Sequence, residues 1–216
     1  MFPLSTVLFP GAGLPLHVFE PRYRALMADC LAADGEFGVV LIARGSEVGG
    51  GDVRTDLGTV ARIAEVTQAD DGRMLVMAYG LRRVRVRRWL VDDPYPRAAV
   101  DDLVDEPAGP PIGAPVDEGS AGPVAPGARA EQAVRRLRSL LSELGQVPAL
   151  PHDLVLTGPD DQVGWHLCGL APLNLMDRQQ LLSSRSHPER MGLLSELCAA
   201  MSDDVTRMLG DGLTDS

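Results

Sequence analysis

Few residues of this chain have side chains suited to enzyme chemistry. All 20 basic residues are arginine, and the sequence contains no lysine. A guanidinium stays protonated near neutral pH, so it cannot serve as a nucleophile or a general base. The sequence therefore excludes Schiff-base catalysis, a serine–lysine dyad and the phosphate-binding lysine of a P-loop.

The remaining reactive side chains form no catalytic or metal-binding pattern. There is no Gly-x-Ser-x-Gly elbow, and His17 lies in an alternating stretch where a structural histidine is favoured over a catalytic base. His166 and Cys168 stand two residues apart, which places them on different faces of a helix. We therefore predict no enzymatic activity, no metal and no cofactor. The cysteines are widely spaced among apolar neighbours, which predicts buried thiols in a reducing compartment: Cys30, Cys168 and Cys198.

An arginine cluster is the most prominent charged feature of the sequence. Five arginines fall between residues 82 and 88, and on a strand Arg83, Arg85 and Arg87 share one face. This alternation predicts a basic row on an exposed face of a sheet. The row has three candidate partners: an acidic peptide, a nucleic-acid backbone, or the chain's own acids. We favour the third, because residues 1–104 carry 12 arginines against 14 acidic residues. The acids nearest in sequence are Asp92, Asp93, Asp101 and Asp102.

The elements around this cluster are read from hydrophobic periodicity. Residues 1–104 show mainly period two, interrupted by a helix that opens at Glu20-Pro21 and is ended by Gly35. Asp71-Gly72 marks a hairpin turn. These signals predict a small antiparallel barrel or sandwich with one inserted helix. The predicted strands are residues 36–43, 57–67, 73–79, 82–90 and 97–104.

The second part of the chain is helical and follows a segment rich in proline and glycine. Residues 105–129 contain six prolines and five glycines, which predicts a flexible linker or long loop. Residues 130–216 then show helical spacing of apolar residues, with Asp160 and Asp161 as capping candidates. The predicted fold class is α+β: a β-barrel subdomain, then a helical bundle. The predicted helices are residues 131–145, 160–170, 174–183 and 188–209.

Composition and charge restrict the possible partners. Net charge −10 disfavours a nucleic-acid binder, since the phosphate backbone attracts basic surfaces. No apolar run approaches ~18 residues, so we expect no membrane-spanning helix. The N-terminus has no basic region before its apolar run and no small-residue cleavage site, so we expect a cytoplasmic protein.

Several of these segments resemble the Lon N-terminal, or substrate-binding, domain family. The stretch from Leu8 to Arg24, reading LFPGAGLPLHVFEPRYR, is similar to that family's opening signature. The further similar segments are residues 37–42, 58–63, 80–86, Pro94-Tyr95, and 177–182 with Arg190. The resemblance implies a PUA-like pseudo-barrel followed by helices, in agreement with the change of period.

The resemblance also implies a function. It suggests a stand-alone Lon N-domain protein without ATPase and peptidase domains. Such a protein would bind unfolded or apolar polypeptide, or serve as an adaptor for a protease or another complex. The alternative is RNA binding through the arginine row, because PUA-like barrels recur in RNA-modifying proteins. Arg22 and Arg24 of the opening signature are further binding candidates, although we favour ion pairs within the fold for both.

Overall fold

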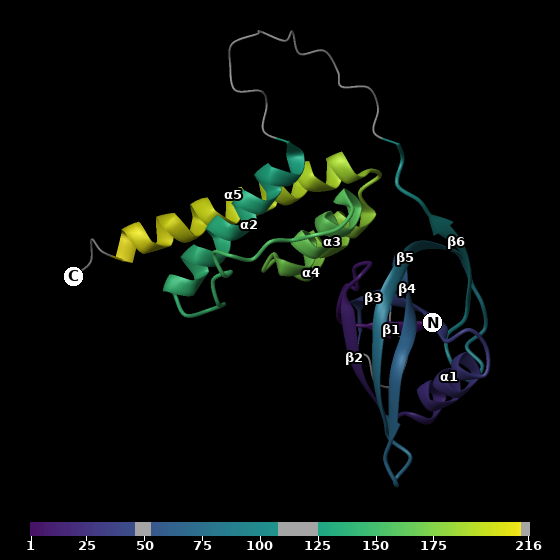
Figure 1. Ribbon diagram of the computed structural model, residues 1–216. Coiled ribbons are helices and arrows are strands. Elements are labelled where there is room, and N and C mark those ends of the chain that lie inside the picture. The colour runs from purple at the N-terminus through teal and green to yellow at the C-terminus, as the bar shows by residue number, and fades with distance from the viewer. Residues whose placement is uncertain (46–52, 108–124, 213–216) are drawn as a thin grey trace. The chain divides into compact units, whose positions relative to one another are not determined.

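The computed structural model describes residues 1–45, 53–107 and 125–212 (Figure 1). The chain forms two compact units, Met1–Val104 and Asp105–Ser216, which we call unit 1 and unit 2. The centre of the predicted linker, residues 108–124, lies outside the described residues. No helix in the described part of the chain is long and apolar enough to cross a membrane.

Unit 1 is built on one sheet with the strand order β1-β3-β4-β5-β2, and β6 also pairs with β5. β1 runs parallel to β3, and the other neighbours are antiparallel. The segments predicted as two strands, 73–79 and 82–90, form the single strand β5. A register shift at Leu81 explains the difference, because Val60 aligns with Arg82 while Ala61 aligns with Gly80. The strands are β1 (Phe2–Leu4), β2 (Gly13–Val18), β3 (Glu36–Arg44), β4 (Val53–Gln68), β5 (Met74–Trp89) and β6 (Ala98–Leu103).

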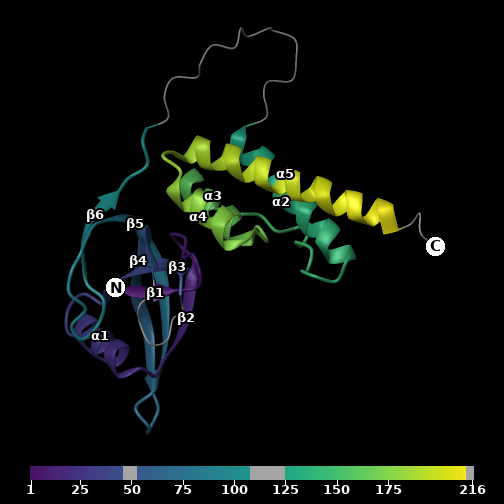
Figure 2. The same cartoon turned by 180° about the vertical axis from the view of Figure 1, so that it is seen from behind.

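The sheet curls into a half-barrel with one helix against it (Figure 1, Figure 2). Register shifts interrupt the ladders β3–β4, β4–β5 and β5–β6, and such bulges bend strands and increase their twist. The predicted turn joins β4 to β5, with Gly72 at φ +80° and its amide donating to the carbonyl of Ala69 at 2.8 Å. Helix α1 (Pro21–Leu31) starts with proline in its first turn, as predicted.

The core of unit 1 lies between α1 and the curled sheet. The ring of Phe2 stacks on that of Tyr23 with centroids 4.1 Å apart, so β1 is tied to α1. Apolar side chains that alternate along β2 and β5 face the same cluster, as period two requires. Other buried members are Leu8, Leu14, Val18, Leu26, Met27, Phe37, Val39, Ala61, Val76 and Ala78.

Unit 2 consists of α2 (Pro126–Glu143), α3 (Asp160–Leu170), α4 (Leu175–Ser183) and α5 (His187–Gly212), with α2 and α5 side by side in both views (Figure 1, Figure 2). The α+β fold class predicted from the sequence is confirmed. α2 begins at Pro126, inside the predicted linker, because proline suits the first helical turn. The side chains of Asp160 and Asp161 make no cap hydrogen bond. They lie in the first turn of α3, where their negative charges interact favourably with the positive end of the helix dipole.

Candidate functional site

The strongest candidate site in unit 1 is a pocket of about 370 Å³ along β2. Every residue of β2 from Leu14 to Val18 lines it, together with Phe2 and Leu4 of β1. Because successive residues of a strand point to opposite faces, a pocket touched by all of them lies at the edge of the strand. The other lining residues are Thr6, Phe19, Glu20 and Tyr23.

The topology explains why this edge is open. β1 and β2 stand at opposite ends of the strand order, and within the described residues β1 pairs only with β3 and β2 only with β5. The half-barrel therefore ends at β1 and β2, and side chains of both strands line the pocket. We call it the edge pocket.

The residues that line the edge pocket are mostly apolar, and the polar ones are Thr6, His17 and Glu20 besides the hydroxyl of Tyr23. Phe19 is 50% exposed, and its ring lies 5.9 Å from the ring of His17. The Glu20 carboxylate accepts a hydrogen bond from Nε of Arg22 at 3.0 Å, and the Arg22 guanidinium also lies 4.5 Å from the centre of the Tyr23 ring. An apolar hollow whose single carboxylate is already ion-paired is suited to apolar side chains.

The predicted exposed row of Arg83, Arg85 and Arg87 is wrong at its first member. Arg83 is 3% exposed, and it aligns with Thr59 of β4 and with Leu103 of β6. Thr59 is fully buried and donates from its hydroxyl to the carbonyl of Leu8 at 2.6 Å, so the segment before β2 crosses over this position. Alternation along β5 gave no sign of that covering segment.

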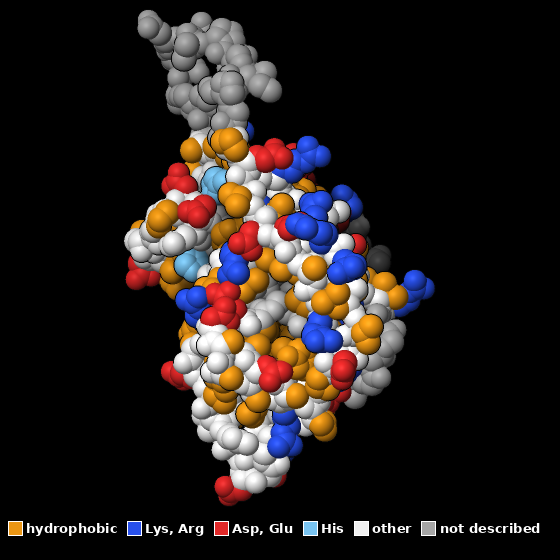
Figure 3. Space-filling model, turned by 90° about the vertical axis from the view of Figure 1, so that its right-hand side faces the viewer, with side chains coloured by type: hydrophobic (Ala, Val, Ile, Leu, Met, Phe, Trp, Pro, Cys, Tyr) orange, Lys and Arg blue, Asp and Glu red, His pale blue; other side chains and the backbone are white. Residues whose placement is uncertain are grey.

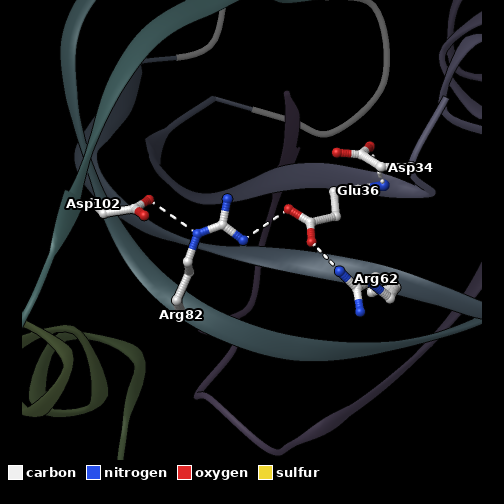
Figure 4. A network of polar contacts seen from close by, with 5 residues as sticks. All are labelled: Asp34, Glu36, Arg62, Arg82 and Asp102. Atoms are coloured by element: carbon white, nitrogen blue, oxygen red, sulfur yellow. Dashed lines mark hydrogen bonds and ion pairs between the residues drawn. The ribbon is translucent and has the colours of Figure 1, made fainter.

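An ion-pair network holds a neighbouring arginine of the cluster (Figure 4). Glu36 accepts from Arg62 at 2.6 Å and from Arg82 at 2.7 Å, and Nε of Arg82 also donates to Asp102 at 3.0 Å. The backbone amide of Glu36 donates to Asp34 at 3.2 Å. The hydrogen bond from Arg82 holds the pKa of the Glu36 carboxyl below its usual value, because it stabilises the ionised form.

Further arginines of unit 1 are also paired within the fold. Arg87 donates to Asp101, which lowers the pKa of that carboxyl. Arg54 binds Asp92 through both terminal nitrogens, at 2.7 and 3.2 Å, and lies 4.9 Å from the centre of the Trp89 ring. Figure 3 shows acidic, basic and hydrophobic side chains intermixed on one face of the molecule. Acids of the chain thus pair with Arg82 and Arg87 of the predicted cluster.

The other candidate arginines lie apart from one another. The guanidinium of Arg24 lies against the β4–β5 turn, since a methyl group on Gly72 would stand 2.4 Å from it. Arg85 is exposed and aligns with Leu57 on one side and Asp101 on the other. Among the five predicted binding residues, Arg22 places its side chain against lining residues of the edge pocket, in an ion pair with Glu20 and over the ring of Tyr23.

The cysteines are buried free thiols, as predicted. Burial raises the pKa of Cys168 and Cys198 to about 12 and also raises that of Cys30, so all three stay protonated near neutral pH. His166 is exposed while Cys168 is buried, so the pair does not converge. Within the described ranges, no group of three or more histidine, cysteine or acidic side chains is placed to hold a metal ion.

A buried ion pair in unit 2 was missed from the sequence. Arg190 is fully buried, its guanidinium binds Asp105 at 2.6 and 3.3 Å, and it lies 3.6 Å from the centre of the Trp165 ring. Asp105 therefore belongs to unit 2 and not to a free linker. The only sequence signal was Arg190 itself, a charged residue on the apolar stripe of the last helix.

This architecture, a curled half-barrel sheet with an inserted helix followed by C-terminal helices, is that of the Lon N-terminal domains. The chain belongs to the ATP-dependent protease La (LON) substrate-binding domain family, whose family model matches residues 1–199. A substrate-binding domain of a protease implies polypeptide substrates in general.

Individual relatives agree with this assignment. The crystal structure of the Lon N-terminal domain protein from Xanthomonas campestris matches with a TM-score of 0.59 and 30% identity, over 89% of this chain and 94% of that one. The N-terminal domain of the Mycobacterium avium complex Lon protease shares the fold, with a TM-score of 0.55, 17% identity and coverage of 91% and 96%. Lon protease 2 of Myxococcus xanthus is 30% identical over 201 residues, which are 89% of this chain but 22% of that protein. The chain thus spans about a fifth of the length of that curated relative.

Proposed function

We propose that this protein binds exposed apolar segments of polypeptide in the edge pocket, without catalysing a reaction, and that it delivers them as an adaptor in protein quality control. The carrying observation is the apolar pocket along the edge of β2 that pairs with no other described strand, in a chain of the substrate-binding family. In native proteins apolar segments are buried, so the pocket discriminates in favour of unfolded chains.

The arginine pairing argues against the RNA alternative. Nucleic-acid affinity requires basic groups that are available to phosphates. Arg83 is buried, and Arg82 and Arg87 are held by carboxylates of the same unit. Polypeptide is therefore favoured over RNA as the ligand.

The proposal is tested by comparing native and unfolded forms of one model protein as ligands. We expect the intact chain to bind the unfolded form and not the native form, in fluorescence anisotropy titrations. The variant Phe19→Ser removes a half-exposed aromatic ring from the pocket and should weaken binding about tenfold, which is the effect of losing one buried apolar side chain.

The matched control is Val91→Ser, at a residue of unit 1 that is 79% exposed and does not line the pocket. It should bind like the unchanged protein. Equal affinity for native and unfolded ligand, or equal weakening by both substitutions, would contradict the proposal.

A further inference from the structure

We infer that the edge pocket binds its polypeptide as an added β-strand, paired through main-chain hydrogen bonds to the free edge of β2. This inference rests on the proposed function and specifies the ligand: an extended, unfolded segment with apolar side chains, recognised mainly through its backbone. A free strand edge of this kind carries a row of donors and acceptors that another extended chain can satisfy.

The register of β2 shows which backbone groups face outward. The amide of Gly80 donates to the carbonyl of Ala12 at 2.9 Å, and the carbonyl of Gly80 accepts from the amide of Gly11 at 2.8 Å. Gly11, at φ +78°, and Ala12 thus form a bulge opposite Gly80, and the regular ladder continues from Ala12. Antiparallel ladders alternate, and the β2–β5 register continues without a shift, so Leu14, Leu16 and Val18 also bond to β5. The backbone groups of the residues between them therefore point to the open edge: Gly13, Pro15 and His17.

The outward row has a defined composition. Gly13 and His17 each offer one amide and one carbonyl, while Pro15 offers a carbonyl only. Pro15 accordingly stands where proline is tolerated in a sheet, with its missing N–H on the open side. The resulting gap in donors disfavours pairing of this edge with the same edge of a second copy, since both strands would lack a bond. A peptide segment with a full set of amides leaves one such gap, where a second copy would leave two.

The walls of the pocket suit the side chains of such a strand. A strand added to β2 would lie between β2 and β1, whose Phe2 and Leu4 form part of the lining. The only charged side chain of the lining, Glu20, is ion-paired with Arg22. The site therefore selects ligands with apolar side chains and does not require a charged one. The main-chain hydrogen bonds to β2 do not depend on the amino-acid sequence of the ligand. Both properties fit a receptor for many different unfolded chains.

The test uses an eight-residue apolar peptide of leucine, valine and serine and two N-methylated derivatives that are isomers of each other, one methylated at odd and the other at even residues. Methylation removes amide donors while the side chains stay the same. We expect the intact protein to bind the parent peptide and at least one isomer to bind about tenfold more weakly. If the parent peptide and unfolded protein both fail to bind, the proposed function fails. If all three peptides bind equally, polypeptide binding stands and strand addition is wrong.

A pair of variants tests the same edge from the protein side. His17→Pro removes one outward amide, and His17→Ala removes the side chain but keeps that amide. The proline variant should bind the parent peptide about fivefold more weakly than the alanine variant, with circular dichroism and thermal unfolding used to show that both are folded. Equal affinities of two folded variants would overturn the inference.

Amide hydrogen exchange gives a readout that does not depend on a variant. Saturating peptide should slow exchange at Gly13 and His17, whereas Leu14 and Leu16 are already held by β5. Unchanged exchange at both outward amides would overturn strand addition. Sedimentation distinguishes the other occupant: a dimer that saturating peptide does not dissociate would show that a second copy occupies the edge, and would overturn the inference.

Discussion

Arg83 is a buried cation in a strand whose neighbouring arginines are solvent-exposed. Arg83 aligns with Thr59, which is buried and bonded to the carbonyl of Leu8 in the segment before β2. A guanidinium cannot lose its proton to escape the cost of burial, so the surrounding structure must satisfy it. Arg83 is therefore a structural residue, in contrast to the exposed Arg85.

Removing the side chain of Arg83 should destabilise the fold, whereas removing that of Arg85 should not. Arg83→Ala is expected to lower the free energy of unfolding by about 1–3 kcal/mol, because it removes buried packing and polar contacts. Arg85→Ala, the matched control, should stay within about 0.5 kcal/mol of the unchanged protein. Urea unfolding measures both values, and equal stability of the two variants would contradict this assignment.

Glu36 should make stability depend on pH in the acid range. Its folded pKa lies below the ordinary 4.5, so its contribution is complete above that value and is lost as the pH falls through the folded pKa. Arg62 and Arg82 are about half exposed, and solvent screening limits the effect of Glu36→Gln to about 0.5–1 kcal/mol at pH 7. The difference from the unchanged protein should shrink below pH 4.5 in urea unfolding. A difference that persists in acid would show that the carboxylate charge is not responsible.

The strands of unit 1 depend on close backbone approach at one glycine of β5. A methyl group on Gly80 would stand 2.3 Å from the carbonyl oxygen of Phe9, a backbone atom, so the crossing segment would have to shift. The same segment leads into β2, and it is bonded to Gly80 at a second point, where the amide of Gly11 donates to the carbonyl of Gly80 at 2.8 Å. Gly80 thus fixes the path of the chain into the edge pocket.

Substitution of one glycine by alanine should lower the stability of unit 1, whereas the same substitution at a glycine of unit 2 should raise the stability of that unit. Gly80→Ala is expected to destabilise unit 1 by about 2 kcal/mol or more, because a packed backbone must move. Gly192→Ala in α5 should stabilise unit 2 by about 0.5–1 kcal/mol, since no neighbouring atom lies within 4 Å of the added methyl and alanine favours the helix. Thermal unfolding distinguishes them, and a destabilising Gly192→Ala would contradict the open space seen there.

Periodicity was sufficient to predict most elements but not their connections. α3 has the predicted bounds, and β3 and α4 differ from the predictions by one residue, because short-range patterns determine them. Two predicted strands form the single strand β5 because a bulge at Leu81 interrupts the alternation, and the sequence contains no local signal for this bulge. The edge pocket was also not located from the sequence, since it requires knowing that β1 and β2 are the ends of the strand order.

At the scale of the whole molecule, the chain has two compact units, and each contains buried apolar side chains. Unit 1 buries apolar side chains between α1 and the sheet, and unit 2 buries those of its four helices. Asp105 follows β6 by two residues in sequence, yet its carboxylate binds Arg190 of α5. The division between the units therefore falls between two adjacent residues, Val104 and Asp105.

Loss of the Asp105 carboxylate should therefore affect unit 2 alone. Asp105→Ala leaves the fully buried Arg190 guanidinium without its carboxylate, and breaking a buried pair from one side costs about 3 kcal/mol or more. Hydrogen exchange followed by mass spectrometry should show faster exchange in α3 and α5 and unchanged exchange in β4 and β5. The converse control, Thr59→Val, removes the buried hydrogen bond to Leu8 and should speed exchange in unit 1 only. If Asp105→Ala loosened β4 and β5 as much as α5, the two cores would form one cooperative unit, because separate cores transmit no such change.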